Sequence, residues 1–287
     1  MSPRLATSAK RDLDRGRLLI CLAALLWSLA GVFIKLLDVH PLTIVFYRSF
    51  FASLVFVPFL KSSEFRFNGL IIVSVISYTA AITAFVSANK LTTAANAIVL
   101  QYTAPVLVYL FSRLVLGEKI STPNALALAV SMAGVGFISV DNAGEPEMSG
   151  VVLALLSGVL FAIYMVNLEQ IKEVSSTYLT WLNNLACALL VLPFVKAPLA
   201  LATDQLLIVA IMGAVQLGVP YFLFSRGLRT IPLQEAALIA LIEPVLNPIW
   251  VALTVGEIPS FATAAGGAMI LSALTVRYLG PVLSSSR

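Results

Sequence analysis

Charged residues are scarce in this chain of 287 residues: Asp, Glu, Lys and Arg together make up 11%, whereas soluble domains carry about 25%. The sequence has one histidine and two cysteines, and both cysteines fall within apolar runs, so we expect buried thiols and neither a disulfide nor a metal site. A Gly-rich phosphate loop and an HExxH motif are missing, and the apolar runs offer no pair of carboxylates and no histidine for intramembrane catalysis. We therefore expect no enzyme, no cofactor and no metal.

Apolar residues are abundant instead, at 60% of the chain with a mean hydropathy of +0.98, which predicts an all-α integral membrane protein. Apolar runs of about 20 residues predict ten membrane-spanning helices. These are Leu18–Leu37, Leu42–Leu60, Leu70–Ala88, Ala94–Leu116, Pro123–Val140, Gly150–Leu168, Tyr178–Val195, Leu206–Ser225, Gln234–Val255 and Phe261–Leu279. The short connections leave no room for a nucleotide-binding, kinase or DNA-reading domain.

The basic residues predict that both termini are cytoplasmic. With that orientation, fourteen Lys and Arg residues lie inside and only Lys35, Lys90 and Lys196 lie outside, as the positive-inside rule requires. The pI of about 9.1 then reflects cytoplasmic loops that face anionic membrane lipid, and no nucleic acid partner is expected.

A sequence duplication divides the chain into halves. The run from Ala97 to Glu118 matches the run from Ala236 to Glu257, 139 residues later, without a gap. Five crossings per half make the second copy inverted, which is the architecture of many secondary transporters. The expected division is a cytoplasmic tail (1–17), repeat 1 (18–140), an outer loop (141–149), repeat 2 (150–279) and a cytoplasmic tail (280–287). A duplicated scaffold without transport is the alternative.

Glu243 is the only carboxylate near the middle of a predicted span. It lies beside Pro244, Asn247 and Pro248, and prolines free backbone carbonyls one turn earlier, so a polar patch forms at membrane depth. Glu243 could couple transport to protons, pair with a substrate ammonium group, or close the helix break by a hydrogen bond. Pro105 breaks the equivalent span of repeat 1, and we expect Pro105, Pro244 and Pro248 to act as hinges.

Arg48 is the only arginine that we place within the membrane, since Arg113 and Arg277 are assigned to the cytoplasmic ends of their spans. It lies close enough to the outer end of its helix to snorkel to the surface or pair within the bundle, and it could equally hold a substrate carboxylate. Other polar and aromatic groups predicted in spans suit a cavity for small organic ligands. These are Trp27, Tyr78, Asn96, Gln101, Tyr102, Phe161, Tyr164, Asn167, Trp181, Asn183 and Gln216. One intramembrane arginine favours an uncharged or zwitterionic substrate over a multiply phosphorylated one.

Small residues also recur at every fourth position of the fifth and tenth spans. Ala125, Ala129 and Ala133 correspond to Ala264, Ala268 and Ser272. Such stripes let helices approach closely in lipid, so we expect these two helices to pack on each other or on a second copy of the chain.

These features together resemble the EamA family of the drug/metabolite transporter superfamily. The resemblance rests on the inverted repeat, Leu26-Trp27-Ser28, Pro41 with Arg48, the prolines of the fourth and ninth spans, and the Gly-Glu pairs at 117–118 and 256–257. It implies a bacterial inner-membrane exporter of amino acids and related metabolites, monomeric or homodimeric, with the Gly-Glu pairs at helix ends. Chain length and aromatic content are most similar to the aromatic amino acid exporter branch (YddG). The glutamate through which small four-helix relatives couple protons has no counterpart in the first span here.

Overall fold

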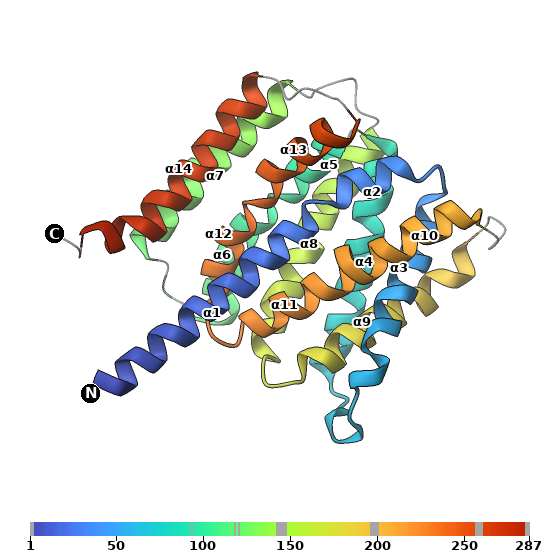
Figure 1. The fold of residues 1–287 in the computed structure, drawn as a ribbon, viewed down its shortest axis with the longest axis horizontal. Helices are drawn as coiled ribbons and strands as arrows, with labels where there is room; N and C mark the ends of the chain where they lie inside the picture. Colours follow the sequence, from blue (N-terminus) through green and yellow to red (C-terminus); the bar gives the residue numbers. More distant parts are fainter. Residues whose placement is uncertain are drawn as a thin grey trace.

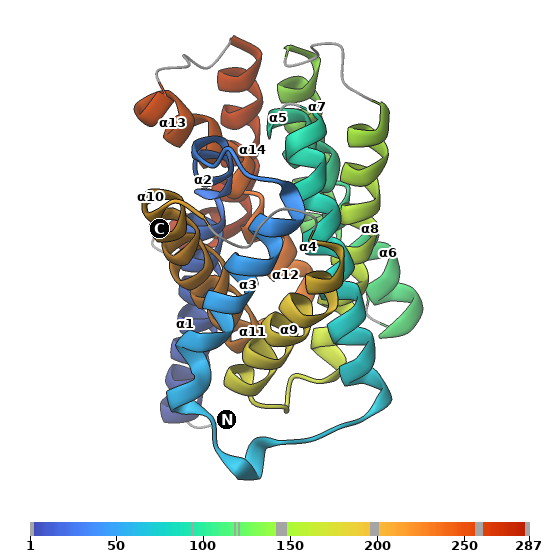
Figure 2. The same ribbon diagram turned by 90° about the vertical axis from the view of Figure 1, so that its right-hand side faces the viewer.

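The computed structural model describes residues 3–92, 94–117, 119, 121–141, 148–195, 201–255 and 261–284, and every regular element within them is helical (Figures 1 and 2). The α-helices of the first half are α1 (Pro3–Trp27), α2 (Ala30–Leu36), α3 (Pro41–Phe56), α4 (Gly69–Leu91), α5 (Ala94–Gln101), α6 (Ala104–Val115) and α7 (Thr122–Asp141). Those of the second half are α8 (Met148–Gln170), α9 (Ser176–Val191), α10 (Thr203–Ile211), α11 (Val219–Gly227), α12 (Leu233–Ala240), α13 (Glu243–Val255) and α14 (Phe261–Ser284).

Shorter elements connect or extend these helices. The 3-10 turns η1 (Val57–Phe59), η2 (Ser62–Glu64) and η3 (Leu192–Phe194) lie at or after the ends of α3 and α9, and the π-helix η4 (Met212–Gly218) joins α10 to α11.

The helices are long and apolar enough for a multi-pass membrane protein. Among the described residues, seven helical runs can cross a membrane, and three shorter apolar helices lie within the predicted fourth, fifth and tenth spans. The first run is already helical from Pro3, well before its apolar segment begins at Leu18. Residues 3–17 are rich in helix formers such as Leu, Ala, Lys and Arg, which explains this extension. At the other end, α14 continues through the first residues of the predicted 280–287 tail.

Two helical runs break at corresponding places, as the prolines predicted. The first break separates α5, ending at Gln101, from α6, and the second separates α12, ending at Ala240, from α13. Pro105 and Pro244 each lie in the first turn of the helix that follows. The backbone N–H groups of a first turn have no acceptor within the helix, so the missing N–H of proline costs no hydrogen bond there. The two breaks are 139 residues apart in sequence, the spacing of the duplicated stretch.

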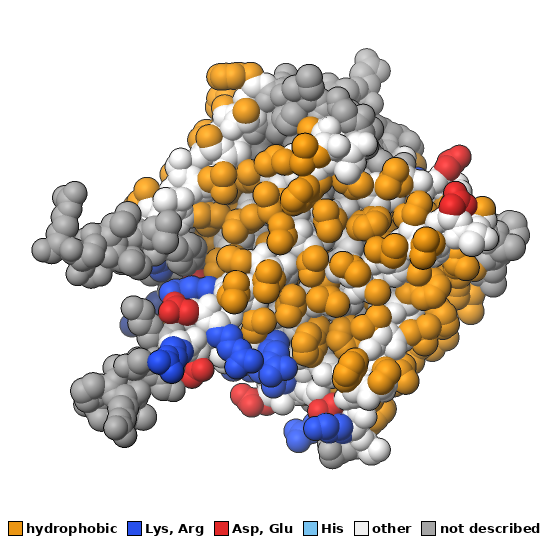
Figure 3. Space-filling model, in the orientation of Figure 1, with side chains coloured by type: hydrophobic (Ala, Val, Ile, Leu, Met, Phe, Trp, Pro, Cys, Tyr) orange, Lys and Arg blue, Asp and Glu red, His pale blue; other side chains and the backbone are white. Residues whose placement is uncertain are grey.

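Four close helix pairs build most of the bundle: α3 with α9, α4 with α8, α1 with α11, and α7 with α14. The α7 and α14 pair forms one edge of the molecule, beside α13 (Figure 1). The face seen in Figure 3 is largely hydrophobic, and its Lys and Arg side chains gather at one end. An apolar girdle with charge at an end is what a bilayer requires of a spanning bundle.

The helices α7 and α14 pack on each other, but the small-residue stripes that were expected to make this contact do not make it. Ala125, Ala129 and Ala133, with Ala264, Ala268 and Ser272, are all exposed. The helices meet instead at Gly134, where a Cβ would lie 2.6 Å from the backbone oxygen of Gly266. Both stripes remain on the outer surface because the buried face of each helix is set by this glycine contact. They are therefore available only to lipid or to a second copy.

Candidate functional site

The two helix breaks face each other in the centre of the bundle. The Tyr102 hydroxyl, at the first break, lies 2.7 Å from Glu243 Oε2 and 3.0 Å from the Ala240 backbone oxygen, both at the second break. Tyr102 is 6% and Glu243 is 9% exposed. The single hydroxyl proton is shared between a buried carboxyl group and a carbonyl that the break leaves without a helical donor.

A small cavity of about 20 Å³ adjoins this contact. Its lining combines aromatic, apolar and polar residues: Trp27, Gln101, Tyr102, Ala104, Pro105, Phe161, Met165, Ala237, Ala240 and Glu243. A space of that size admits roughly one water molecule. A metabolite can enter only if the surrounding helices move.

An aromatic cluster surrounds Tyr221 of α11 next to the cavity. The Tyr221 ring centroid lies 4.9 Å from that of Trp27 and 4.9 Å from that of Tyr78, and 5.9 Å from that of Tyr164. Phe161 completes the cluster at 6.4 Å. Edge-to-face contacts of this kind bring side chains of α1, α4, α8 and α11 together. Sequence reasoning missed Tyr221, although its position after Pro220 inside a predicted span was a usable signal.

Amide side chains of α9 hold the next layer of the bundle together. Asn183 Nδ2 donates to Ser74 Oγ at 3.0 Å and to the Tyr164 hydroxyl at 3.3 Å. The Tyr78 hydroxyl donates to Asn184 Oδ1 at 2.8 Å. Because these groups are buried and hydrogen-bonded to each other, they fix the tyrosine rings at the cavity.

Arg48 lies in the middle of α3 with only 2% of its surface exposed, so it does not snorkel. Its Nε and Nη1 atoms are buried without a hydrogen-bond partner. The groups that interact with it electrostatically are Tyr78, Tyr221 and Cys187, and none is a carboxylate.

The first helical run also breaks, between α1 and α2, where no proline lies. Asn247 Nδ2 of α13 donates to the freed Ser28 carbonyl at 2.8 Å, and Trp250 Nε1 donates to Ser28 Oγ at 2.8 Å. Gln216 Nε2, from η4, donates to the Trp27 carbonyl at 3.3 Å. Asn247 and Gln216 therefore stabilise this break, and Trp27, the last residue of α1 before it, lines the cavity.

The remaining predicted residues lie elsewhere. Trp181 packs on Phe65 and Tyr178 near one end of the bundle, away from the aromatic cluster, and Asn167 Nδ2 donates to the Leu70 carbonyl. Gly117, at the end of α6, has a φ of 68°, as a helix-terminating glycine requires. The side chains of Asn96 and Pro248, and residues 118, 256 and 257, lie outside the described part of the structure.

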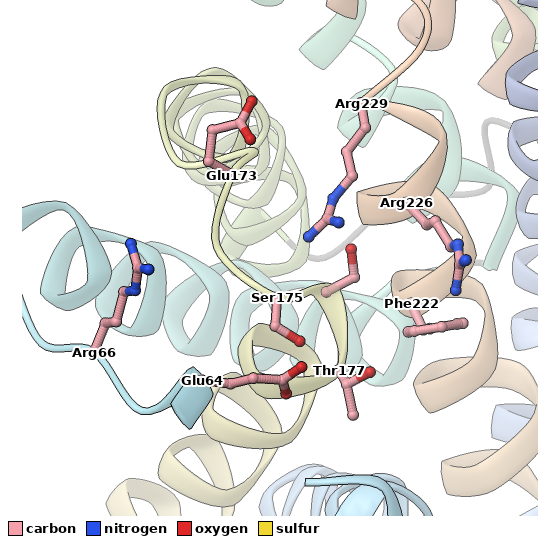
Figure 4. Close-up of a pocket in the computed structure, with 9 residues that line it drawn as sticks. Glu64, Arg66, Glu173, Ser175, Thr177, Phe222, Arg226 and Arg229 are labelled. Carbon is pink, nitrogen blue, oxygen red and sulfur yellow. The ribbon is translucent and has the colours of Figure 1, made fainter. Parts of the chain in front are cut away.

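A larger hollow of about 350 Å³ opens at the end of the bundle where basic side chains gather (Figure 4). It is lined by Glu64, Arg66, Glu173, Ser175, Ser176, Thr177, Phe222, Arg226 and Arg229. Figure 4 shows Arg66 on one side of the hollow and the Arg226 and Arg229 pair on the other. The lining is rich in charged and hydroxyl side chains, in contrast to that of the central cavity.

A multi-pass helical bundle whose broken helices meet at a buried polar and aromatic cavity defines a membrane transporter. The chain belongs to the EamA-like transporter family, whose model matches residues 14–140 and again residues 148–279. Two proteins of Archaeoglobus fulgidus, each named an uncharacterized transporter, are similar over nearly their whole length. One is 28% identical, covering 93% of this chain and 98% of the relative, and the other is 24% identical, covering 91% and 96%.

A solved structure described as the crystal structure of a protein superposes with a TM-score of 0.81 at 20% identity, covering 93% of this chain and 97% of that one. At that identity the likeness shows the fold alone.

Proposed function

We propose that this transporter exports amino acids, aromatic and other neutral ones among them, and related small metabolites across a plasma membrane of the bacterial inner-membrane type. The observation that carries the proposal is the meeting of the two broken helices at Tyr102 and Glu243, beside a cavity walled by Trp27 and Phe161. Aromatic walls with a few placed polar groups suit a small amphipathic solute. Broken helices at membrane depth are the usual place for a transported substrate.

Alternating access between a 5+5 pair of inverted repeats, with ten spans and both termini cytoplasmic, is the proposed mechanism. Three observations support it: the family model matches twice, the helix breaks repeat at the duplication spacing, and the helix pairs α4 with α8 and α11 with α1 are equivalent under exchange of the halves. Because the central cavity holds about a water molecule, the described conformation is closed. The charged hollow at the basic end is then the cytoplasmic vestibule through which substrate enters.

The test is flux into liposomes that contain the purified protein. Labelled phenylalanine, labelled threonine and a labelled sugar are compared, each with and without a pH gradient, and protein-free liposomes give the leak. Saturable phenylalanine flux that unlabelled phenylalanine competes away is expected. Sugar, nucleotide or drug flux without amino acid flux would favour the alternative substrate classes, and absence of all flux would favour a non-transporting scaffold.

The monomer is the proposed transport unit, since the cavity and both breaks lie within one chain. The exposed stripes on α7 and α14 offer a surface for lipid or for a homodimer. In either case, the flux per protein molecule is expected to be independent of the protein density in the liposome.

A further inference from the structure

Arg48 differs from the other arginines whose contacts the structure gives. Arg17 is paired with Glu235 at 2.6 Å, and Arg229 Nη2 donates to the Val174 carbonyl at 2.6 Å, both toward an end of the bundle. Arg48 lies in the core with two guanidinium nitrogens unpaired, and no ion pair of the described residues includes it. The guanidinium group stays protonated in proteins, so a positive charge is buried there without compensation.

Burying an unpaired guanidinium group lowers the stability of the fold, so its presence requires an explanation. A charged side chain near the bilayer centre costs about 2.5 to 3.5 kcal/mol on insertion scales, and more when it lacks a partner. The neighbours do not neutralise it, since Tyr78 and Tyr221 carry hydroxyl groups and Cys187 Sγ accepts a hydrogen bond from Ser49 at 3.3 Å. Buried donors without partners are rare in folded proteins, and a functional role is one of the reasons for which they are kept.

The surroundings of Arg48 place it next to the transport cavity. Tyr221 interacts electrostatically with both Arg48 and Glu243, and its ring packs on Trp27, which lines the cavity. Trp27 Nε1 is a second buried donor without a partner. Arg48 and the cavity-lining Trp27 thus share Tyr221 as a neighbour.

The helix that carries Tyr221 has the irregular geometry that local movement needs. The π-helix η4 ends one residue before α11 starts, and π-helical turns are frequent at functional sites. Gly213 of η4 lies against the backbone oxygen of Arg48, and Gly218 lies against Ala52, so α3 and η4 are in close backbone contact. A shift of η4 along α3 would move Tyr221 away from Arg48 and open the cavity to it.

We propose that Arg48 binds the carboxylate of the transported solute, which makes it the residue that selects monocarboxylates and amino acids over analogues that lack the carboxylate. The proposal deepens the proposed function and rests on it for the identity of the cavity. A single guanidinium group matches one carboxylate, whereas a phosphate ester carries more charge than one arginine neutralises. The carboxylate would pair with Arg48 while the rest of the solute lies among Tyr221, Trp27 and Phe161.

Ligand binding to the purified protein tests this directly. The panel is phenylalanine, hydrocinnamate (carboxylate without ammonium), phenylalanine amide and phenethylamine (ammonium without carboxylate), measured with the wild type, Arg48→Gln, Arg48→Lys and the exposed control Arg113→Gln. The wild type should bind the two carboxylates roughly 10- to 100-fold more tightly than the two amines, as the loss of a charge-assisted hydrogen bond predicts. In Arg48→Gln the four affinities should converge, while Arg113→Gln should match the wild type.

Thermal unfolding without ligand separates binding from a structural role. Arg48→Gln should unfold at the same or a higher temperature than the wild type, because an uncompensated charge has been removed. A lower unfolding temperature, or a carboxylate preference that survives in Arg48→Gln, would overturn the proposal. If Arg48→Gln does not fold, Arg48→Met takes its place, and a carboxylate preference that survives in Arg48→Met would overturn the proposal equally.

The two proposals fail in different ways. Carboxylate binding that depends on Arg48 without phenylalanine flux would keep the anion site and remove amino acid export. Phenylalanine flux in a wild type that binds the amines as tightly as the carboxylates would keep export and remove the anion site.

Discussion

Replacing Glu243 by glutamine separates the three roles that its position allows. The glutamine side chain has nearly the same volume as the glutamate side chain. Its Oε1 can still accept the hydrogen bond from the Tyr102 hydroxyl, which in the wild type is 2.7 Å from Glu243 Oε2. Because the contact survives, the free energy of unfolding should fall by less than about 1 kcal/mol. The proton and the negative charge are lost, so any change in flux reports chemistry and not folding.

Tyr102→Phe is the matched structural variant. It keeps the ring in the cavity wall but leaves the carboxyl group of Glu243 and the Ala240 carbonyl without a donor. Burying such groups unpaired should cost about 1 to 2 kcal/mol, since hydrogen bonds within membrane bundles reach at most about 1.7 kcal/mol. The double variant should then show a coupling free energy, because the two side chains act on one another directly.

Flux with and without a pH gradient decides the role. A proton-coupling Glu243 predicts that Glu243→Gln still exchanges phenylalanine but no longer responds to the gradient. An ammonium-binding Glu243 predicts a KM for phenylalanine that rises roughly tenfold while the gradient response stays. Flux and gradient response equal to the wild type, with Tyr102→Phe alone impaired, would refute both and leave Glu243 as a structural partner of Tyr102.

Three further predictions follow from other parts of the bundle. Asn247→Ala leaves the Ser28 carbonyl unpaired at the α1 break and should lower the unfolding free energy by about 1 kcal/mol, whereas unchanged stability would show that the break needs no partner. Gly213→Ala places a Cβ against the Arg48 backbone and should destabilise by about 1 to 3 kcal/mol, while Gly136→Ala, which meets nothing within 4 Å, should be neutral or slightly stabilising. In a chain lacking Cys21 and Cys187, Asp38→Cys should react with an impermeant thiol reagent from outside intact cells and Lys61→Cys only after permeabilisation; the reverse would invert the proposed topology.

The sequence predicted the helix breaks well, because their cause is local. Proline has no backbone donor and crowds the carbonyl one turn earlier, so α6 and α13 begin next to Pro105 and Pro244, whereas Pro248, also expected to break the span, lies within α13 without ending it. The membrane class followed equally directly, since few charges and long apolar runs admit little else. Tyr102, Glu243, Trp27 and Phe161 were predicted cavity residues, and the structure brings them together.

Other features depend on which helix faces which, and periodicity does not encode that in a membrane. The α1 break has no proline and exists because Asn247 and Trp250 reach Ser28 from the far end of the chain. The small-residue stripes predicted a helix contact, yet α7 and α14 approach each other at Gly134 instead. Trp181 was grouped with the cavity by residue type alone, although it packs at the end of the bundle.

What the sequence determined by itself was therefore the environment and the local backbone: a bilayer as solvent, the helical runs, their proline breaks and their duplication. In lipid every spanning helix is apolar on most faces, so hydrophobic patterning says little about helix orientation. Only the tertiary structure decided that the rings of Trp27, Tyr78 and Tyr221, from three different helices, pack together beside the cavity. Only the tertiary structure decided that Arg48 is enclosed and not at the membrane surface, because α3 and the π-helix of the second half pack around it through contacts more than 150 residues apart in sequence.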